Sequence, residues 1–141
     1  MDKRPITPEG HKRLKDELDY IKNIKRQDII DAISEARAHG DLKENAEYHA
    51  AREEQGLNEA RIREIEEALS LSTVIEYKEL GNENIVKFGS HVTILDLNSS
   101  EKKTYQIVGE FEADIDNNTI SITTPIGKAL LKKETGDIVE V

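Results

Sequence analysis

The chain has 141 residues, of which 35% are charged and only 4% are aromatic, and its formal net charge is −9. This composition argues against one large globular core, and a net acidic chain is not expected to bind nucleic acid strongly on its own, because phosphate binding needs a basic surface. The absence of cysteine excludes disulfides and thiolate metal sites.

The sequence shows neither a membrane span nor a secretory signal. No apolar run reaches the roughly 18 residues that a transmembrane helix needs. The first ten residues, MDKRPITPEG, lack the apolar core of a signal peptide. We therefore expect a cytoplasmic protein with no membrane partner.

Residues 1–75 are predicted to be helical. Thr7 is a suitable N-cap, and Pro8 suits the first helical position. Gly40 suits the left-handed residue that closes a helix. Between them, apolar residues recur at helical spacing, namely Leu14, Leu18, Ile21, Ile29, Ile30, Ile33 and Ala36. This pattern predicts one long first helix.

A second helical pattern runs from Leu42 to Ser72. Its apolar stripe begins with Ala46, Ala50 and Leu57 and continues, with a shift in phase, through Ile62, Ile65 and Leu69. Two helices of about 30 residues joined by a short turn should pack as an antiparallel hairpin with arms of roughly 45 Å. We expect its tip at residues 39–45.

Residues 76–141 are predicted to form a second domain, a small antiparallel sheet with one short helix. Strands are expected within 85–97, 102–111 and 118–124, and a helix within 124–133 begins with a Thr-Pro pair. A fourth strand is expected at 136–141. A sheet that ends on an uncovered strand is unusual, which favours a natural domain that continues beyond Val141. The predicted fold class is α+β.

The stretch DLKE, residues 41–44, permits two interpretations. Asp41 as N-cap with Glu44 three residues later is the capping-box pattern, which satisfies free amides at a helix start. On a helix that begins there, however, Asp41, Glu44, Tyr48 and Arg52 fall within roughly 80° of one another. The pair of acids would then head a polar stripe at the end of a rod, opposite the alanines that face the partner helix.

Two carboxylates alone do not complete the octahedral oxygen coordination that Mg²⁺ prefers. No further acidic cluster in the sequence supplies the missing ligands. If Asp41 and Glu44 bind a metal ion, the other ligands belong to a partner.

The segment EARAHGDLKENAEYHAAREEQG strongly resembles the tip region of the bacterial GreA-type transcript cleavage factors, a likeness that extends through TPEGHKRLKDELDYIK, RIREIEEALS, VKFGSHVTILDL and TPIGKALL. The resemblance implies an N-terminal antiparallel coiled coil and an FKBP-like C-terminal domain. It also implies a transcription elongation factor that binds bacterial RNA polymerase and inserts the coiled coil into the secondary channel. There it would stimulate the polymerase to cleave the 3′ end of backtracked nascent RNA. The family's C-terminal domain usually extends past the segment matched by residues 136–141.

Residue roles follow from the same resemblance. Asp41 and Glu44 match the tip acids, which hold a second Mg²⁺ shared with the polymerase, so the chain needs no cofactor of its own and acts in trans rather than as an enzyme. Arg37, Asn45, Tyr48 and Arg52 match tip positions that contact RNA or polymerase. Arg37 is equally explained by the dipole of a helix C-terminus, and Tyr48 by packing on the hairpin surface. His39 and His49 are expected to be solvated.

Three other functions stay open at this point. The first is a Gre-like inhibitor that plugs the channel, although two tip acids favour stimulation of cleavage. For a cleavage factor, the acidic hairpin favours short RNA products. The second is an FKBP-like isomerase or chaperone, which the scarcity of aromatic residues after residue 76 disfavours. The third is a coiled-coil adaptor in which the tip acids are only caps.

Overall fold

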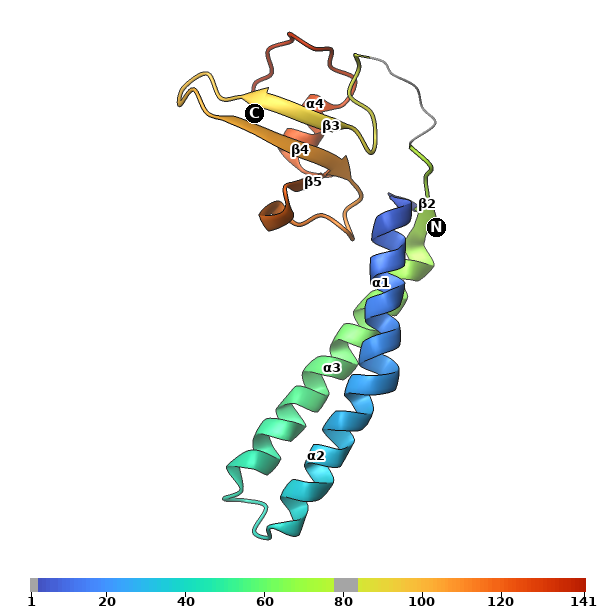
Figure 1. Cartoon of the computed structure of the whole chain (residues 1–141), viewed down its shortest axis with the longest axis vertical. Helices are drawn as coiled ribbons and strands as arrows, with labels where there is room; N and C mark the ends of the chain where they lie inside the picture. Colours follow the sequence, from blue (N-terminus) through green and yellow to red (C-terminus); the bar gives the residue numbers. More distant parts are fainter. Residues whose placement is uncertain (1–2, 78–83) are drawn as a thin grey trace. The chain divides into compact units, whose positions relative to one another are not determined.

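The computed structural model describes residues 3–77 and 84–141. A long helical hairpin comes first and a small sheet with one short helix follows (Figure 1), so the predicted α+β class is confirmed. Contacts between residues divide the chain into two units, Lys12–Ser70 and a second composed of Met1–His11 with Leu71–Val141. The domain division predicted at residue 75 stays a prediction. Within the described residues, no helix has both the length and the apolar character to cross a membrane.

The first arm of the hairpin is helical from Pro8 to Ala38 in three parts. Helix α1 spans Pro8–Tyr20, a π-helical turn η1 spans Ile21–Lys25, and helix α2 spans Arg26–Ala38. The Thr7 hydroxyl accepts a hydrogen bond from the Gly10 amide at 3.0 Å, so the predicted N-cap is confirmed. The π turn was not predicted, because the wider turn at 21–25 leaves no proline or glycine signal in the sequence.

The second arm is helix α3, Ala46–Leu71, which runs antiparallel to α1 and α2 (Figure 1). The predicted start at Leu42 is wrong by four residues. The predicted first part of its packing stripe is also wrong, since Ala46, Ala50 and Leu57 are exposed. The buried side chains are instead Ala51, Asn58, Ile62, Ile65 and Ala68. The polar Asn58 occupies a core position, which is why the apolar pattern seemed to shift in phase.

Cross-helix ion pairs align the two arms. The pairs are Glu17 with Arg61 at 2.7 Å, Lys22 with Glu66 at 3.0 Å, and Arg26 with Glu59 at 2.8 Å. In all of them the side chains are more than a third exposed, so each contributes at most about 1 kcal/mol. Their main effect is on the alignment of the arms. The two arginine pairs are bidentate, so they disfavour a shift of one arm along the other.

The second unit contains two sheets. Strand β1, Arg4–Ile6, pairs in parallel with β2, Ser72–Val74. This pairing joins the segments that precede α1 and follow α3. The sequence did not predict it, because three-residue strands carry too little periodicity to be recognised.

The larger sheet has the order β3-β4-β5, with strands His91–Leu95, Lys102–Val108 and Thr119–Ser121. Strands β3 and β4 are antiparallel, as predicted, but β4 and β5 are parallel. The predicted all-antiparallel sheet is therefore wrong in this detail. Residues 109–118 connect the two strands and include the 3-10 helix η2 at Ile115–Asn117. This connection is long enough to return the chain to the end of the sheet at which β4 begins, as parallel pairing requires.

Helix α4, Pro125–Leu130, packs on this sheet, and Thr124 caps it by accepting a hydrogen bond from the Gly127 amide, as predicted. The core consists of Ile107, Ile120 and Leu130, with Val139 among the side chains packed against it. The predicted strand at 136–141 is wrong, since these residues form no strand. Val139 packs on the core without joining the ladder, whereas Ile138 and Val141 are exposed.

Candidate functional site at the hairpin tip

Residues 39–45, here called the tip loop, connect α2 to α3. The amides of His39 and Gly40 donate to the carbonyls of Ala36 and Arg37 at 3.2 and 3.1 Å, closing the last turn of α2. Gly40 has φ +82°, which confirms its predicted role. Asp41 follows with φ +29°, so two successive residues adopt left-handed backbone and turn the chain away from the helix axis.

Asn45, and not Asp41, caps α3. The Asn45 side-chain oxygen accepts a hydrogen bond from the Tyr48 amide at 3.0 Å, the contact made by an N-cap residue. The capping-box interpretation of DLKE is therefore wrong, and so is the placement of Asp41 and Glu44 on a helical face. Physically, an N-cap residue needs extended backbone, and the positive φ of Asp41 excludes that.

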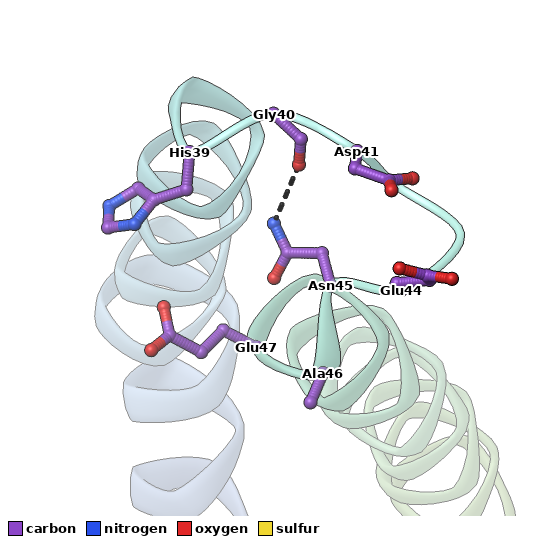
Figure 2. A pocket seen from close by; sticks show the side chains of 7 residues that line it. All are labelled: His39, Gly40, Asp41, Glu44, Asn45, Ala46 and Glu47. Atoms are coloured by element: carbon purple, nitrogen blue, oxygen red, sulfur yellow. Dashed lines mark hydrogen bonds between the residues drawn. The ribbon is translucent and has the colours of Figure 1, made fainter.

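Asp41 and Glu44 instead lie in the tip loop and are exposed. Figure 2 shows both side chains on the stretch of loop between Gly40 and Asn45, with their carboxylates directed away from α2. Within the described residues, neither side chain takes part in a hydrogen bond or ion pair. They line an open pocket of about 380 Å³ together with His39, Gly40, Asn45, Ala46 and Glu47. Both acids are thus free to bind a cation or a donor from another molecule.

The described residues contain no cluster of three or more His, Cys, Asp or Glu side chains arranged to hold a metal ion. The donor set at the tip is a pair of unpaired carboxylates, which are hard oxygen ligands of the kind that Mg²⁺ accepts. Such a pair suits an ion that is also coordinated by another molecule.

Arg37, Tyr48 and Arg52 form a second group beside the loop. The guanidinium carbons of Arg37 and Arg52 lie 5.9 and 6.0 Å from the centre of the Tyr48 ring, and Arg52 donates to the Tyr48 hydroxyl at 3.2 Å. The Tyr48 ring itself packs against the cluster of Ile29, Ile33 and Ala51. Two cations are therefore held at fixed places near the tip of an acidic chain.

The two arginines also change the chemistry of the tyrosine. Hydrogen bonding to Arg37, the largest effect, and to Arg52 stabilises the phenolate and lowers the pKa of Tyr48, against a smaller opposing effect of burial. The same environment that lowers this pKa would attract a phosphate or carboxylate.

His49 has a contact that the sequence did not reveal. Its Nε2 lies 2.9 Å from the carbonyl oxygen of Lys43, in the middle of the tip loop. Its ring also meets the Tyr48 ring edge-on, with centroids 5.6 Å apart. The side chain is exposed, as expected for a solvated histidine, and it makes these two contacts in addition. The only sequence signal would have been its position one turn after the cap residue Asn45.

Comparisons with known proteins agree with the resemblance noted above. The family models described as "Transcription elongation factor, N-terminal" and "Transcription elongation factor, GreA/GreB, C-term" match residues 4–74 and 81–141. Transcription elongation factor GreA of Francisella tularensis subsp. novicida is 54% identical over 136 residues, covering 96% of this chain and 85% of that protein. A solved structure of the transcription factor Gfh1 is 29% identical and covers 99% of this chain and 88% of its own, with a TM-score of 0.51.

Proposed function

The chain belongs to the GreA/GreB family of transcription elongation factors, and on that premise we propose that its tip loop carries the activity, in trans, at the active site of bacterial RNA polymerase. The hairpin enters the secondary channel of the polymerase. Asp41 and Glu44 then complete a site for a second Mg²⁺ that the polymerase alone holds weakly. The cytoplasm, where transcription takes place, is the site of action.

One observation carries this proposal: two exposed carboxylates, without partners in the described part of the chain, lie on the same side of a loop at the end of a hairpin. A bound Mg²⁺ in such a shared site would supply charge stabilisation for phosphodiester hydrolysis and lower the pKa of a bound water. Asp41 and Glu44 contribute ligand oxygens and negative charge. The catalytic machinery otherwise belongs to the polymerase.

Arg37 and Arg52 have a complementary role in the proposal. The substrate is the 3′ end of backtracked nascent RNA, and its phosphates need cationic partners. Both guanidiniums are held against Tyr48, so they reach an incoming phosphate, or an acidic side chain of the polymerase, without losing much side-chain freedom. Since the chain as a whole is acidic, this local contact explains RNA engagement without autonomous RNA binding.

The test uses backtracked transcription complexes with Mg²⁺. Wild-type protein should accelerate shortening of the RNA, and Asp41→Asn/Glu44→Gln should abolish the acceleration while still competing with wild type for the polymerase. The matched control is Glu53→Gln/Glu54→Gln, which makes the same change in net charge on the exposed surface of α3 and should behave as wild type.

Cleavage by the double tip variant at the wild-type rate would contradict the role of the two acids. If wild-type protein slows nucleotide addition and releases no RNA fragment, the proposal is contradicted and the protein is a channel inhibitor instead.

A further inference from the structure

The side chains of Asn45 and His49 contact three backbone carbonyls at the end of α2 and in the tip loop. The Asn45 side-chain amide nitrogen donates to the carbonyl of Ala36 at 2.7 Å and to that of Gly40 at 3.3 Å, the latter drawn in Figure 2. His49 Nε2 contacts the carbonyl of Lys43 at 2.9 Å. The first two tie the end of α2 to the start of α3, and the third ties the middle of the loop to the first turn of α3.

From this arrangement we propose that Asn45 and His49 are positioning residues, which hold the tip loop in the one backbone conformation that presents Asp41 and Glu44 together. The inference rests on the proposed function, because it concerns how the same two carboxylates act. It assigns to Asn45 a role different from contact with RNA, and to His49 a role where none was expected.

The need for such positioning follows from the backbone of the loop. Asp41 has φ +29°, a conformation that residues other than glycine adopt at a cost. The two acids have no partners of their own within the described residues, so nothing in their side chains keeps the loop in place. Each of the anchored carbonyls, at Gly40 and Lys43, belongs to the residue next to one of the acids.

The anchors themselves are rigidly placed. Asn45 is fixed as the cap of α3 through the Tyr48 amide. The His49 ring lies against the edge of Tyr48, whose ring packs on Ile29, Ile33 and Ala51. The hydrophobic cluster thus fixes the position of Tyr48, Tyr48 fixes that of His49, and His49 holds the loop. A functional group supported in this way retains its geometry better than one on a free loop.

The contact also fixes the protonation of His49. A carbonyl oxygen only accepts hydrogen bonds, so His49 Nε2 must carry a proton. In the neutral side chain this requires the Nε2–H tautomer. Nitrogen NMR of ¹⁵N-histidine-labelled protein at a pH where the ring is neutral should report this tautomer for His49. The Nδ1–H tautomer at His49 would overturn the proposed contact.

Three variants separate positioning from other roles. Asn45→Ser retains an oxygen that caps α3 but has no amide to reach Ala36 and Gly40. His49→Leu removes the donor, whereas His49→Gln restores an N–H at a similar reach. We expect Asn45→Ser and His49→Leu to slow RNA cleavage at limiting Mg²⁺ by about 10- to 100-fold, the cost of a displacement near 1 Å. His49→Gln should recover most of the rate.

Three readouts accompany the cleavage rate. Affinity for the polymerase, measured by competition, should change less than about twofold, and the thermal midpoint of helix unfolding should be preserved in His49→Leu, since the side chain is exposed. Backbone amide order parameters for residues 40–44 should fall in both loss variants and recover in His49→Gln.

The outcomes distinguish this inference from the function on which it rests. If wild type stimulates cleavage and the double tip variant does not, yet His49→Leu and Asn45→Ser cleave as wild type, the positioning role is overturned and the proposed function stands. If wild type itself fails to stimulate cleavage, the proposed function is overturned and the positioning role falls with it. Failure of His49→Gln to restore the rate also contradicts the inference, because any other role of the imidazole would give that result.

Discussion

Tyr48 is the residue that connects the tip loop to the body of the hairpin. Its ring contacts the cluster of Ile29, Ile33 and Ala51 on one side and the guanidiniums of Arg37 and Arg52 on others. An aromatic ring contributes a large contact area at the cost of only two side-chain torsions. It therefore gives two flexible arginines, and through His49 the loop, a fixed support.

A titration of the tyrosines tests this environment. The pKa of Tyr48 is lowered by hydrogen bonding to Arg37 first and also to Arg52, whereas the pKa of Tyr77 is raised, chiefly because its hydroxyl donates to the Glu9 carboxylate. As the pH rises, Tyr48 should lose its proton before Tyr77, which ¹³C NMR at the ring Cζ resolves for each residue.

The control for this titration is Arg37→Met. It removes the main stabiliser of the phenolate and should move the Tyr48 midpoint upward while the Tyr77 midpoint stays in place. Deprotonation of Tyr77 ahead of Tyr48 in the wild type would contradict the described contacts.

At the residue scale, sequence reasoning located the tip and its two acids but assigned the cap to the wrong residue. Asp and Asn are equally good N-caps, and both Asp41 and Asn45 precede helical sequence. Which of the two residues caps α3 depends on how far the loop continues after Gly40, and this is set by the backbone angles of the loop. The contact between His49 and the Lys43 carbonyl depends on those same angles and was equally inaccessible.

At the scale of elements, the π turn at Ile21–Lys25 is matched by a residue on the opposite arm. Asn58, 4% exposed, donates to the carbonyl of Ile21 at 2.9 Å, and the same carbonyl accepts from the Arg26 amide. A π turn widens the helix and redirects one carbonyl, and Asn58 gives it a second partner. A buried polar pair of this kind favours one alignment of the two arms over others.

Two neighbouring substitutions test which face of α3 packs. Asn58→Ala removes a buried hydrogen bond and should lower the free energy of unfolding by about 1–2 kcal/mol. Leu57→Ala changes a side chain that is 67% exposed and should cost less than about 0.5 kcal/mol. Chemical denaturation followed by circular dichroism measures both.

The stripe inferred from the sequence alone makes the opposite prediction, since it places Leu57 in the interface. A larger loss for Leu57→Ala than for Asn58→Ala would support that stripe and contradict the packing described here. These two single substitutions thus distinguish which face of α3 packs against the first arm.

Elements with strong local signals were predictable, and those decided by tertiary pairing were not. The Thr-Pro starts of α1 and α4 and the glycine after α2 have direct chemical causes in one or two residues. The parallel pairing of β4 with β5, and of β1 with β2, depends on segments distant in sequence. Alternation alone specifies a strand but not its partner or direction.

At the scale of the whole molecule, the charges are distributed in a way that fits a factor acting on a site in another protein. The chain is net acidic, yet the described tip brings two arginines to one tyrosine beside two unpaired acids. Strong binding to free RNA is not expected from such a surface. The specificity of the protein would then come from the polymerase that we propose it enters.

The central claim, that Asp41 and Glu44 complete a metal site in another protein, is tested most directly by the Mg²⁺ dependence of RNA cleavage in backtracked complexes. Wild-type protein should lower the Mg²⁺ concentration for half-maximal cleavage by about 10-fold or more, since even the hydrogen-bond partners of metal ligands change metal affinity by about that factor. Asp41→Asn/Glu44→Gln should return it to the value for polymerase alone, and free RNA should stay intact in all samples. An unchanged Mg²⁺ dependence with wild type, or cleavage of free RNA without polymerase, would contradict the claim.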